Sequence, residues 1–132
     1  MGYLLDTNFL IGLWRKRGEG AEATLLAQHP DEVLAIPWVS KGEFLCGAVI
    51  ANHDLERVSE FLAEFPVIWP DDGVLQRYAL IYRRLREQRQ QVGANDLWIA
   101  AAALERRLPL LTRNVRELSR IEGLQVVDYA GA

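Results

Sequence analysis

Short apolar runs alternate with longer amphipathic stretches along this chain. Five of the runs are predicted to form buried strands: 3–5, 33–36, 67–69, 110–112 and 124–127. The stretches between them repeat apolar residues at the three- to four-residue spacing of amphipathic helices. This alternation predicts a three-layer α/β domain, with a mainly parallel sheet of about five short strands flanked by helices.

Polar residues mark where several of these helices begin. Thr7 follows the first strand and is predicted to cap a helix, as is Asn95 before an alanine-rich helix over 95–107. Ser40 and Glu43 fit the S-x-x-E capping box, which indicates a helix over 40–51. The longest helix is expected over 71–90.

Length and composition fit a single domain over 1–132. The chain has 132 residues, 50% of them hydrophobic, enough for one core and too few for two. Its longest apolar run is far shorter than the ~20 residues of a membrane span. Cys46 is the single cysteine and has apolar neighbours, so we expect it to be buried and the protein to be cytoplasmic.

The net charge of -3 excludes a uniformly basic surface of the kind that binds nucleic acid indiscriminately. Local basic clusters remain, and they consist almost entirely of arginine, because Lys16 and Lys41 are the only lysines. Arginine is suited to planar, bidentate contacts with phosphates or carboxylates.

Acidic and amide residues stand where strands are predicted to end and helices to begin. Asp6 ends the first strand, Glu43 and Asp96 lie in first helical turns, and Asn114 and Glu117 follow the fourth strand. A parallel α/β sheet brings all such positions to one edge, where ligands bind. Several carboxylates tolerate one another there if a hard divalent cation such as Mg²⁺ or Mn²⁺ binds among them. The pattern therefore indicates a metal site able to activate water at a phosphate.

Some of these acids also have structural explanations. Glu43 completes the capping box, and Asp96 would complement the dipole of its helix. Asp6 is harder to explain in this way, because a carboxylate that ends a buried strand costs free energy unless it is paired.

Four motifs, taken together and in order, resemble the PIN-domain ribonucleases, and most closely the VapC-type toxins. They are LLDTN at 4–8, S-x-x-EF at 40–44, ND-x-x-IAA at 95–101 and LTRN at 111–114. The resemblance implies Mg²⁺- or Mn²⁺-dependent endonucleolytic cleavage of RNA. It also implies a homodimer and neutralisation by a VapB-like antitoxin.

Residue by residue, the resemblance assigns metal binding and catalysis to Asp6, Glu43 and Asp96. Asn114 is the fourth catalytic position and departs from the family, because many PIN domains have aspartate there. An amide brings no charge, so a second metal ion is left open, as is a role for Glu117 in its place. The supporting residues are Asn8, Ser40, Thr112 and Glu117.

We expect Arg15 and Arg113 to bind phosphates that flank the cleaved one. Single-stranded or looped RNA is the favoured substrate, because exposed bases can stack on aromatic rings. Trp14, Trp38 and Trp98 are candidates for such stacking, although core packing is the more frequent role of a tryptophan.

Three competing hypotheses stay open from the sequence. A structure-specific DNA nuclease would share the metal chemistry. A non-cleaving PIN-like module that binds nucleic acid or a partner is favoured by Asn114 and opposed by the complete set of Asp6, Glu43 and Asp96. A phospho-acceptor receiver domain is remote, because Asp6 stands alone and no lysine follows Lys41.

Overall fold

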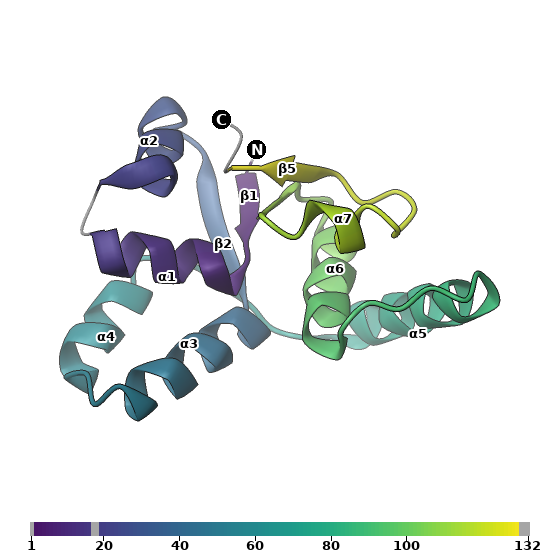
Figure 1. The fold of residues 1–132 in the computed structure, drawn as a ribbon, viewed down its shortest axis with the longest axis horizontal. Coiled ribbons are helices and arrows are strands. Elements are labelled where there is room, and N and C mark those ends of the chain that lie inside the picture. Colours follow the sequence, from purple (N-terminus) through teal and green to yellow (C-terminus); the bar gives the residue numbers. More distant parts are fainter. Residues whose placement is uncertain (1, 17–18, 130–132) are drawn as a thin grey trace.

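The computed structural model of this chain describes residues 2–16 and 19–129, and its central element is a five-stranded sheet (Figure 1). The strands are β1 (Gly2–Leu5), β2 (Val33–Pro37), β3 (Val67–Ile68), β4 (Leu110–Thr112) and β5 (Val126–Asp128). Their order is β3-β2-β1-β4-β5, and every strand pair in the described residues is parallel.

Helices cover both faces of this sheet, so the predicted three-layer α/β architecture is confirmed (Figure 1). On one side lie α1 (Thr7–Lys16), α2 (Gly20–Gln28), α3 (Trp38–Ile50) and α4 (Leu55–Leu62). On the other side lie α5 (Asp72–Glu87), α6 (Ala94–Arg106) and α7 (Val115–Leu118).

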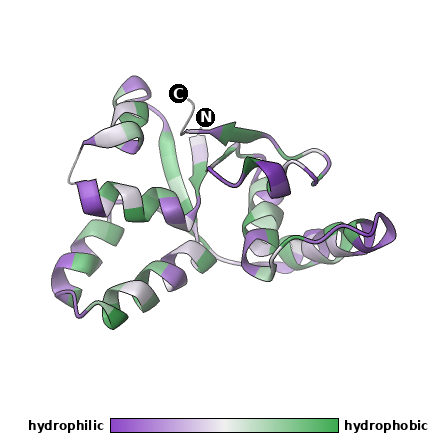
Figure 2. Ribbon diagram, viewed as in Figure 1, coloured by the Kyte–Doolittle hydropathy of each residue, from purple (hydrophilic) through white to green (hydrophobic). Residues whose placement is uncertain are grey.

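The central strand β1 and its neighbour β4 supply apolar side chains to both faces of the sheet. Leu4 and Leu110 pack with α5 and α6, whereas Leu5 and Leu111 pack with α1, α3 and α4. All four leucines are fully buried. Successive strand side chains point to opposite faces, so a strand covered on both sides needs an unbroken apolar run. Figure 2 shows the contrast between the hydrophobic β2 and β5 and the hydrophilic far end of α5.

The chain reverses its direction across the sheet between β1 and β4. From β1 it proceeds outward to β2 and β3, then returns to build β4 and β5 on the other side. The backbone N–H of Asp6 donates to the carbonyl oxygen of Leu111 at 3.3 Å, so the ends of β1 and β4 lie side by side. Such a switch point, at the carboxyl ends of parallel strands, is where α/β folds bind ligands.

Two helix starts differ from the prediction. The cap of α1 is Asp6, whose Oδ1 accepts a hydrogen bond from the N–H of Phe9 at 2.9 Å, and Thr7 is already helical. Likewise α6 begins after Gly93, which leaves the Asn95 side chain free of a capping role. In both cases the predicted cap makes a long-range contact instead, described below.

The prediction that Ser40 and Glu43 form a capping box at the start of α3 is also wrong. This helix begins at Trp38, so Ser40 is inside it, fully buried, and donates its hydroxyl to the carbonyl oxygen of Leu5 at 3.3 Å. Glu43 is therefore in the second turn of the helix and does not cap its start.

Cys46 is exposed rather than buried, because the buried face of α3 is formed by residues four apart, including Ser40 and Phe44.

Other element boundaries shift by a few residues. The helix expected over 71–90 covers Asp72–Glu87, and the last strand is Val126–Asp128 rather than 124–127. Within residues 2–16 and 19–129, no helix is both long enough and apolar enough to cross a membrane.

Candidate active site

Asp6 lies at the centre of the predicted acidic edge. Asp6 is only 6% exposed, and its carboxylate accepts hydrogen bonds from the N–H of Phe9 and the hydroxyl of Thr112. Burial raises the pKa of Asp6 to about 6. The two hydrogen bonds partly oppose that shift, while the charges of Asp96 and Glu43 add to it. Among residues 2–16 and 19–129, no cation compensates this buried carboxylate.

Glu43 faces this site from the second turn of α3. Its Oε1 accepts a hydrogen bond from the hydroxyl of Thr7 at 2.6 Å, and its Oε2 accepts one from Asn95 Nδ2 at 3.1 Å. Thr7 belongs to α1 and Asn95 to α6, so one carboxylate joins the first turns of two helices to α3. The sequence predicts Glu43 in the site but does not reveal these partners, whose only signal is their position beside Asp6 and Asp96.

Asp96, Asn114 and Glu117 form the other half of the site. The amide nitrogen of Asn114 donates to Asp96 Oδ2 at 2.9 Å and to Glu117 Oε2 at 3.3 Å. The backbone N–H of Asn114 donates to Thr112 Oγ1 at 3.0 Å, which ties this half to the hydroxyl that contacts Asp6. The Asn114 amide therefore lies between the carboxylates of Asp96 and Glu117 and donates to both.

The site as a whole is strongly negative. Burial raises the pKa of Asp96; the bond from Asn114 opposes the shift, and the charges of Glu117 and Glu43 increase it. The structure therefore brings together the five predicted positions Asp6, Glu43, Asp96, Asn114 and Glu117. Carboxylate and amide oxygens are the ligands that Mg²⁺ and Mn²⁺ favour, so the donor set is chemically suited to a hard divalent cation.

The acidic side chains are turned toward protein donors. In the part of the chain that the structure describes, no three aspartate, glutamate, histidine or cysteine side chains surround a common point in the way a bound metal requires. The hydrogen bonds of Glu43 and Asp96 account for this arrangement, since each satisfies the carboxylate through a neighbouring hydroxyl or amide.

The remaining predicted residues occupy different positions. Asn8 is exposed in the first turn of α1, next to Thr7. Arg113 is exposed and directly follows Thr112 at the end of β4. Arg15 is exposed in the last turn of α1, about 13 Å along the helix from Asp6 at 1.5 Å per residue.

The three tryptophans pack mainly against other rings. Trp14 contacts Phe44 and Phe61, with centroids 5.9 and 5.3 Å apart. Trp38 and Trp98 contact each other edge to face at 5.8 Å. All three are only partly buried. Their ring partners agree with core packing.

A groove of about 1020 Å³ lies on the same side of the sheet as α1, α2 and α4. Trp14, Arg15, His53 and Phe61 contribute to its lining, and none of the residues of the acidic site does. This groove is therefore separate from the carboxylates of the acidic site, which lie at the sheet edge.

A family model described as PIN domain matches residues 3–124, which include every acid of the site. The chain belongs to the PIN-domain family. This PIN domain is 33% identical to Ribonuclease VapC1 of Haemophilus influenzae strain R2866, with 98% of each chain covered. It is 29% identical to Ribonuclease VapC1 of Methanocaldococcus jannaschii, over 95% of its own length and 86% of the relative's.

The PIN domain also resembles the structure of VapBC-1 from nontypeable Haemophilus influenzae. The TM-score is 0.85 at 30% sequence identity, and the match covers 98% of this chain and 99% of the other. Identity and coverage at this level place the PIN domain in the VapC group.

Proposed function

We propose that this protein is the endoribonuclease toxin of a toxin–antitoxin pair, and that it cleaves RNA in the presence of Mg²⁺ or Mn²⁺. The observation that carries the proposal is the gathering of Glu43, Asp96 and Glu117 around the buried Asp6 carboxylate at the switch point, where no cation of the described residues compensates it. The names of the VapC relatives, which are ribonucleases, support the same function.

Asp6 and Asp96 are the residues that would hold the metal, with Glu43 as a third ligand or through water. Glu43 would first exchange at least one of its bonds to Thr7 and Asn95 for the ion. A divalent cation there supplies charge neutralisation at the phosphate and a more acidic water. The raised pKa values of Asp6 and Asp96 are those expected of ligands whose charge a cation would compensate.

The protein's own groups orient the acids. The N–H of Phe9 and the Thr112 hydroxyl hold Asp6 in one position, and Thr7 and Asn95 each donate a hydrogen bond to Glu43. Asn114 holds Asp96 and presents an amide beside it, which would orient a water without adding charge. Preorganised groups of this kind lower the barrier because they need little rearrangement during the reaction.

The experiment that tests the function compares RNA cleavage by the purified, antitoxin-free protein in Mg²⁺, in Mn²⁺ and in EDTA. Asp96→Asn is expected to fold normally and to lose at least about 100-fold in cleavage rate, because one anionic ligand is missing. Single-stranded RNA, structured RNA and matched DNA oligonucleotides are the substrates.

Cleavage of DNA alone would favour the structure-specific DNA nuclease. Binding of RNA without any cleavage, in every metal, would favour the non-cleaving module, to which Asn114 lends support. An Asp96→Asn protein as active as the wild type would contradict the proposed site.

A second prediction concerns Asn114 and does not depend on activity. Asn114→Asp removes the amide that separates Asp96 from Glu117 and adds a third carboxylate, so in EDTA it should destabilise the fold by about 1–3 kcal/mol. Mg²⁺ should raise the thermal midpoint of this variant more than that of the wild type. Equal responses to Mg²⁺ would show that no ion binds next to position 114.

We propose a VapB-like antitoxin as the protein partner, and a homodimer as the assembly. The former is supported by the VapBC structure that this chain resembles. An arginine from the antitoxin could compensate the acids as a metal ion does, so truncation of the antitoxin segment that carries it should relieve inhibition. The cytoplasm is the proposed location, where RNA is available and Cys46 stays reduced.

A further inference from the structure

Glu22 is a charged residue that the proposed site does not use, although it is only 2% exposed. It belongs to α2 and packs against α1, so closely that a methyl group on Gly12 would overlap its carboxylate. Its Oε1 accepts a hydrogen bond from Lys16 Nζ at 2.9 Å. Burying a carboxylate costs free energy unless a positive charge or hydrogen bonds compensate it. Lys16 supplies a large part of this compensation for Glu22.

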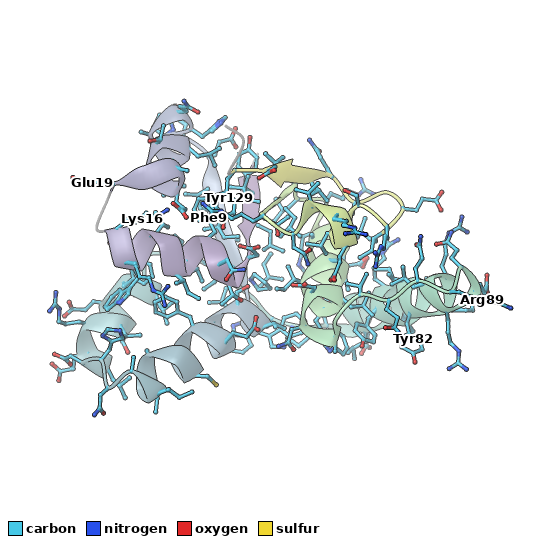
Figure 3. All side chains as sticks on the ribbon, in the orientation of Figure 1. Phe9, Lys16, Glu19, Tyr82, Arg89 and Tyr129 are labelled. Carbon is cyan, nitrogen blue, oxygen red and sulfur yellow. The ribbon has the colours of Figure 1, made fainter. Side chains whose placement is uncertain are left out.

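Arg113 is a second cation near Glu22. Burial alone would raise the pKa of the Glu22 carboxyl, but the bond and charge of Lys16 and the charge of Arg113 hold it below its usual range. The Arg113 guanidinium carbon also lies 5.3 Å from the ring centre of Tyr129, close enough for a cation–π interaction. Tyr129 is almost completely buried and packs on Phe9 at 4.8 Å, beside α1 (Figure 3).

The backbone of Arg113 lies between two residues of the acidic site. Thr112 donates to Asp6, and Asn114 donates to Asp96. Four carboxylates at this edge make it the strongest nearby attraction for a cation. The Arg113 side chain instead lies against the Tyr129 ring and remains exposed. Tyr129 packs on Phe9 and Glu22 packs on Gly12, three residues further along the same helix, so both lie beside α1. The direction of the Arg113 side chain therefore needs a competing attraction, and Glu22 is the buried anion that provides it.

We propose that Glu22 is a positioning residue, which with the Tyr129 ring keeps Arg113 at the rim of the acidic site. There the exposed guanidinium binds an RNA phosphate that neighbours the cleaved one. Without Glu22, Arg113 turns inward and pairs with Asp6 or Asp96, where it competes with both metal and substrate. The inference rests on the proposed ribonuclease function and specifies how its substrate is held.

The test is a double-mutant cycle of Glu22→Gln and Arg113→Ala, read by the affinity for a labelled single-stranded RNA in EDTA at several salt concentrations. Arg113→Ala should weaken binding about tenfold through the lost charge-assisted contact. It should also reduce the slope of log K against log salt by ~0.7, the value for one phosphate on a single strand. Glu22→Gln should produce a similar loss, and the double variant should bind like Arg113→Ala alone.

The control is Arg83→Ala, which removes an exposed arginine from α5 on the other side of the sheet and should leave RNA binding unchanged. Thermal unfolding identifies any variant that fails to fold. If Glu22→Gln does not fold, the second variant is Arg113→Lys, which keeps the positive charge on an exposed residue. It should retain the salt dependence of RNA affinity while binding RNA more weakly than the wild type.

Full additivity of the two losses would assign Glu22 a structural role alone and overturn the proposal. So would an Arg113→Ala protein with unchanged affinity and salt slope, or a wild type that binds no RNA. Because binding is measured without turnover, a wild type that binds RNA with the expected cycle but never cleaves it contradicts the ribonuclease function and leaves the positioning role of Glu22 intact.

Discussion

Asp6→Asn is expected to reduce RNA cleavage by about 10³-fold or more, because it removes the central carboxylate of the site. The fold should survive, since asparagine is as good a helix cap as aspartate and can accept the same bond from the N–H of Phe9. Single-turnover cleavage of RNA at saturating Mg²⁺ measures the effect. An Asp6→Asn protein within tenfold of the wild-type rate would remove Asp6 from the mechanism.

The same substitution should increase stability at neutral pH. The pKa of Asp6 is about 6 in the folded protein against 3.8 for the unperturbed group, so the folded state binds this proton more tightly. In EDTA the wild-type unfolding free energy should therefore fall between about pH 4 and pH 6 by on the order of 2–3 kcal/mol relative to Asp6→Asn, and the difference should then stay constant.

Denaturant unfolding of both proteins across this pH range checks the prediction. Asp96 contributes in the same direction in both proteins, because its pKa is also raised, and so cancels in the comparison to a first approximation. Parallel pH profiles would mean that Asp6 carries no uncompensated charge. Mg²⁺ at pH 7.5 should restore stability to the wild type and not to the variant.

Gly12→Ala should be the most destabilising small substitution in α1. A methyl group there would overlap the buried Glu22 carboxylate, which the helix packing and Lys16 hold in place. Overpacking of this kind is expected to cost about 1–3 kcal/mol, in spite of the better helix propensity of alanine.

The matched control is Gly47→Ala in α3, where the added methyl group meets nothing within 4 Å apart from its chain neighbours and the backbone of its own helix. That substitution should stabilise the protein by about 1 kcal/mol, because alanine is the better helix former. Chemical denaturation of the two variants beside the wild type measures both values. If Gly12→Ala were also stabilising, the contact between α1 and Glu22 would have to be loose.

The strands were predictable because burial on two faces imposes an unbroken apolar run. The fourth strand agrees residue for residue at Leu110–Thr112, whereas the fifth was placed two residues early. Leu124 has the hydrophobicity of a strand residue but lies in the loop before β5, partly buried against the core that contains Leu4 and Leu110. Hydrophobicity alone does not distinguish a buried loop residue from a strand residue.

The helix caps were predicted less well, and the reason lies in the site. Thr7 and Asn95 have the chemistry of caps, but both donate to Glu43, 36 and 52 residues away in the chain. A local rule compares only the few residues around a helix start. In the tertiary fold both side chains lie next to the Glu43 carboxylate, and they donate hydrogen bonds to it instead of capping their helices.

The sequence by itself determined the α/β class, the positions of the acids at strand and helix ends, and their meeting at one edge, because parallel topology brings those ends together. Only the tertiary structure decided what each acid bonds to. It also decided that β1 adjoins β4, and that Glu22 and Tyr129 lie beside Arg113. The β1–β4 pairing and the proximity of Glu22 to Arg113 join segments about 90 to 106 residues apart in sequence, and Tyr129 is 16 residues from Arg113, so local patterns encode none of these contacts.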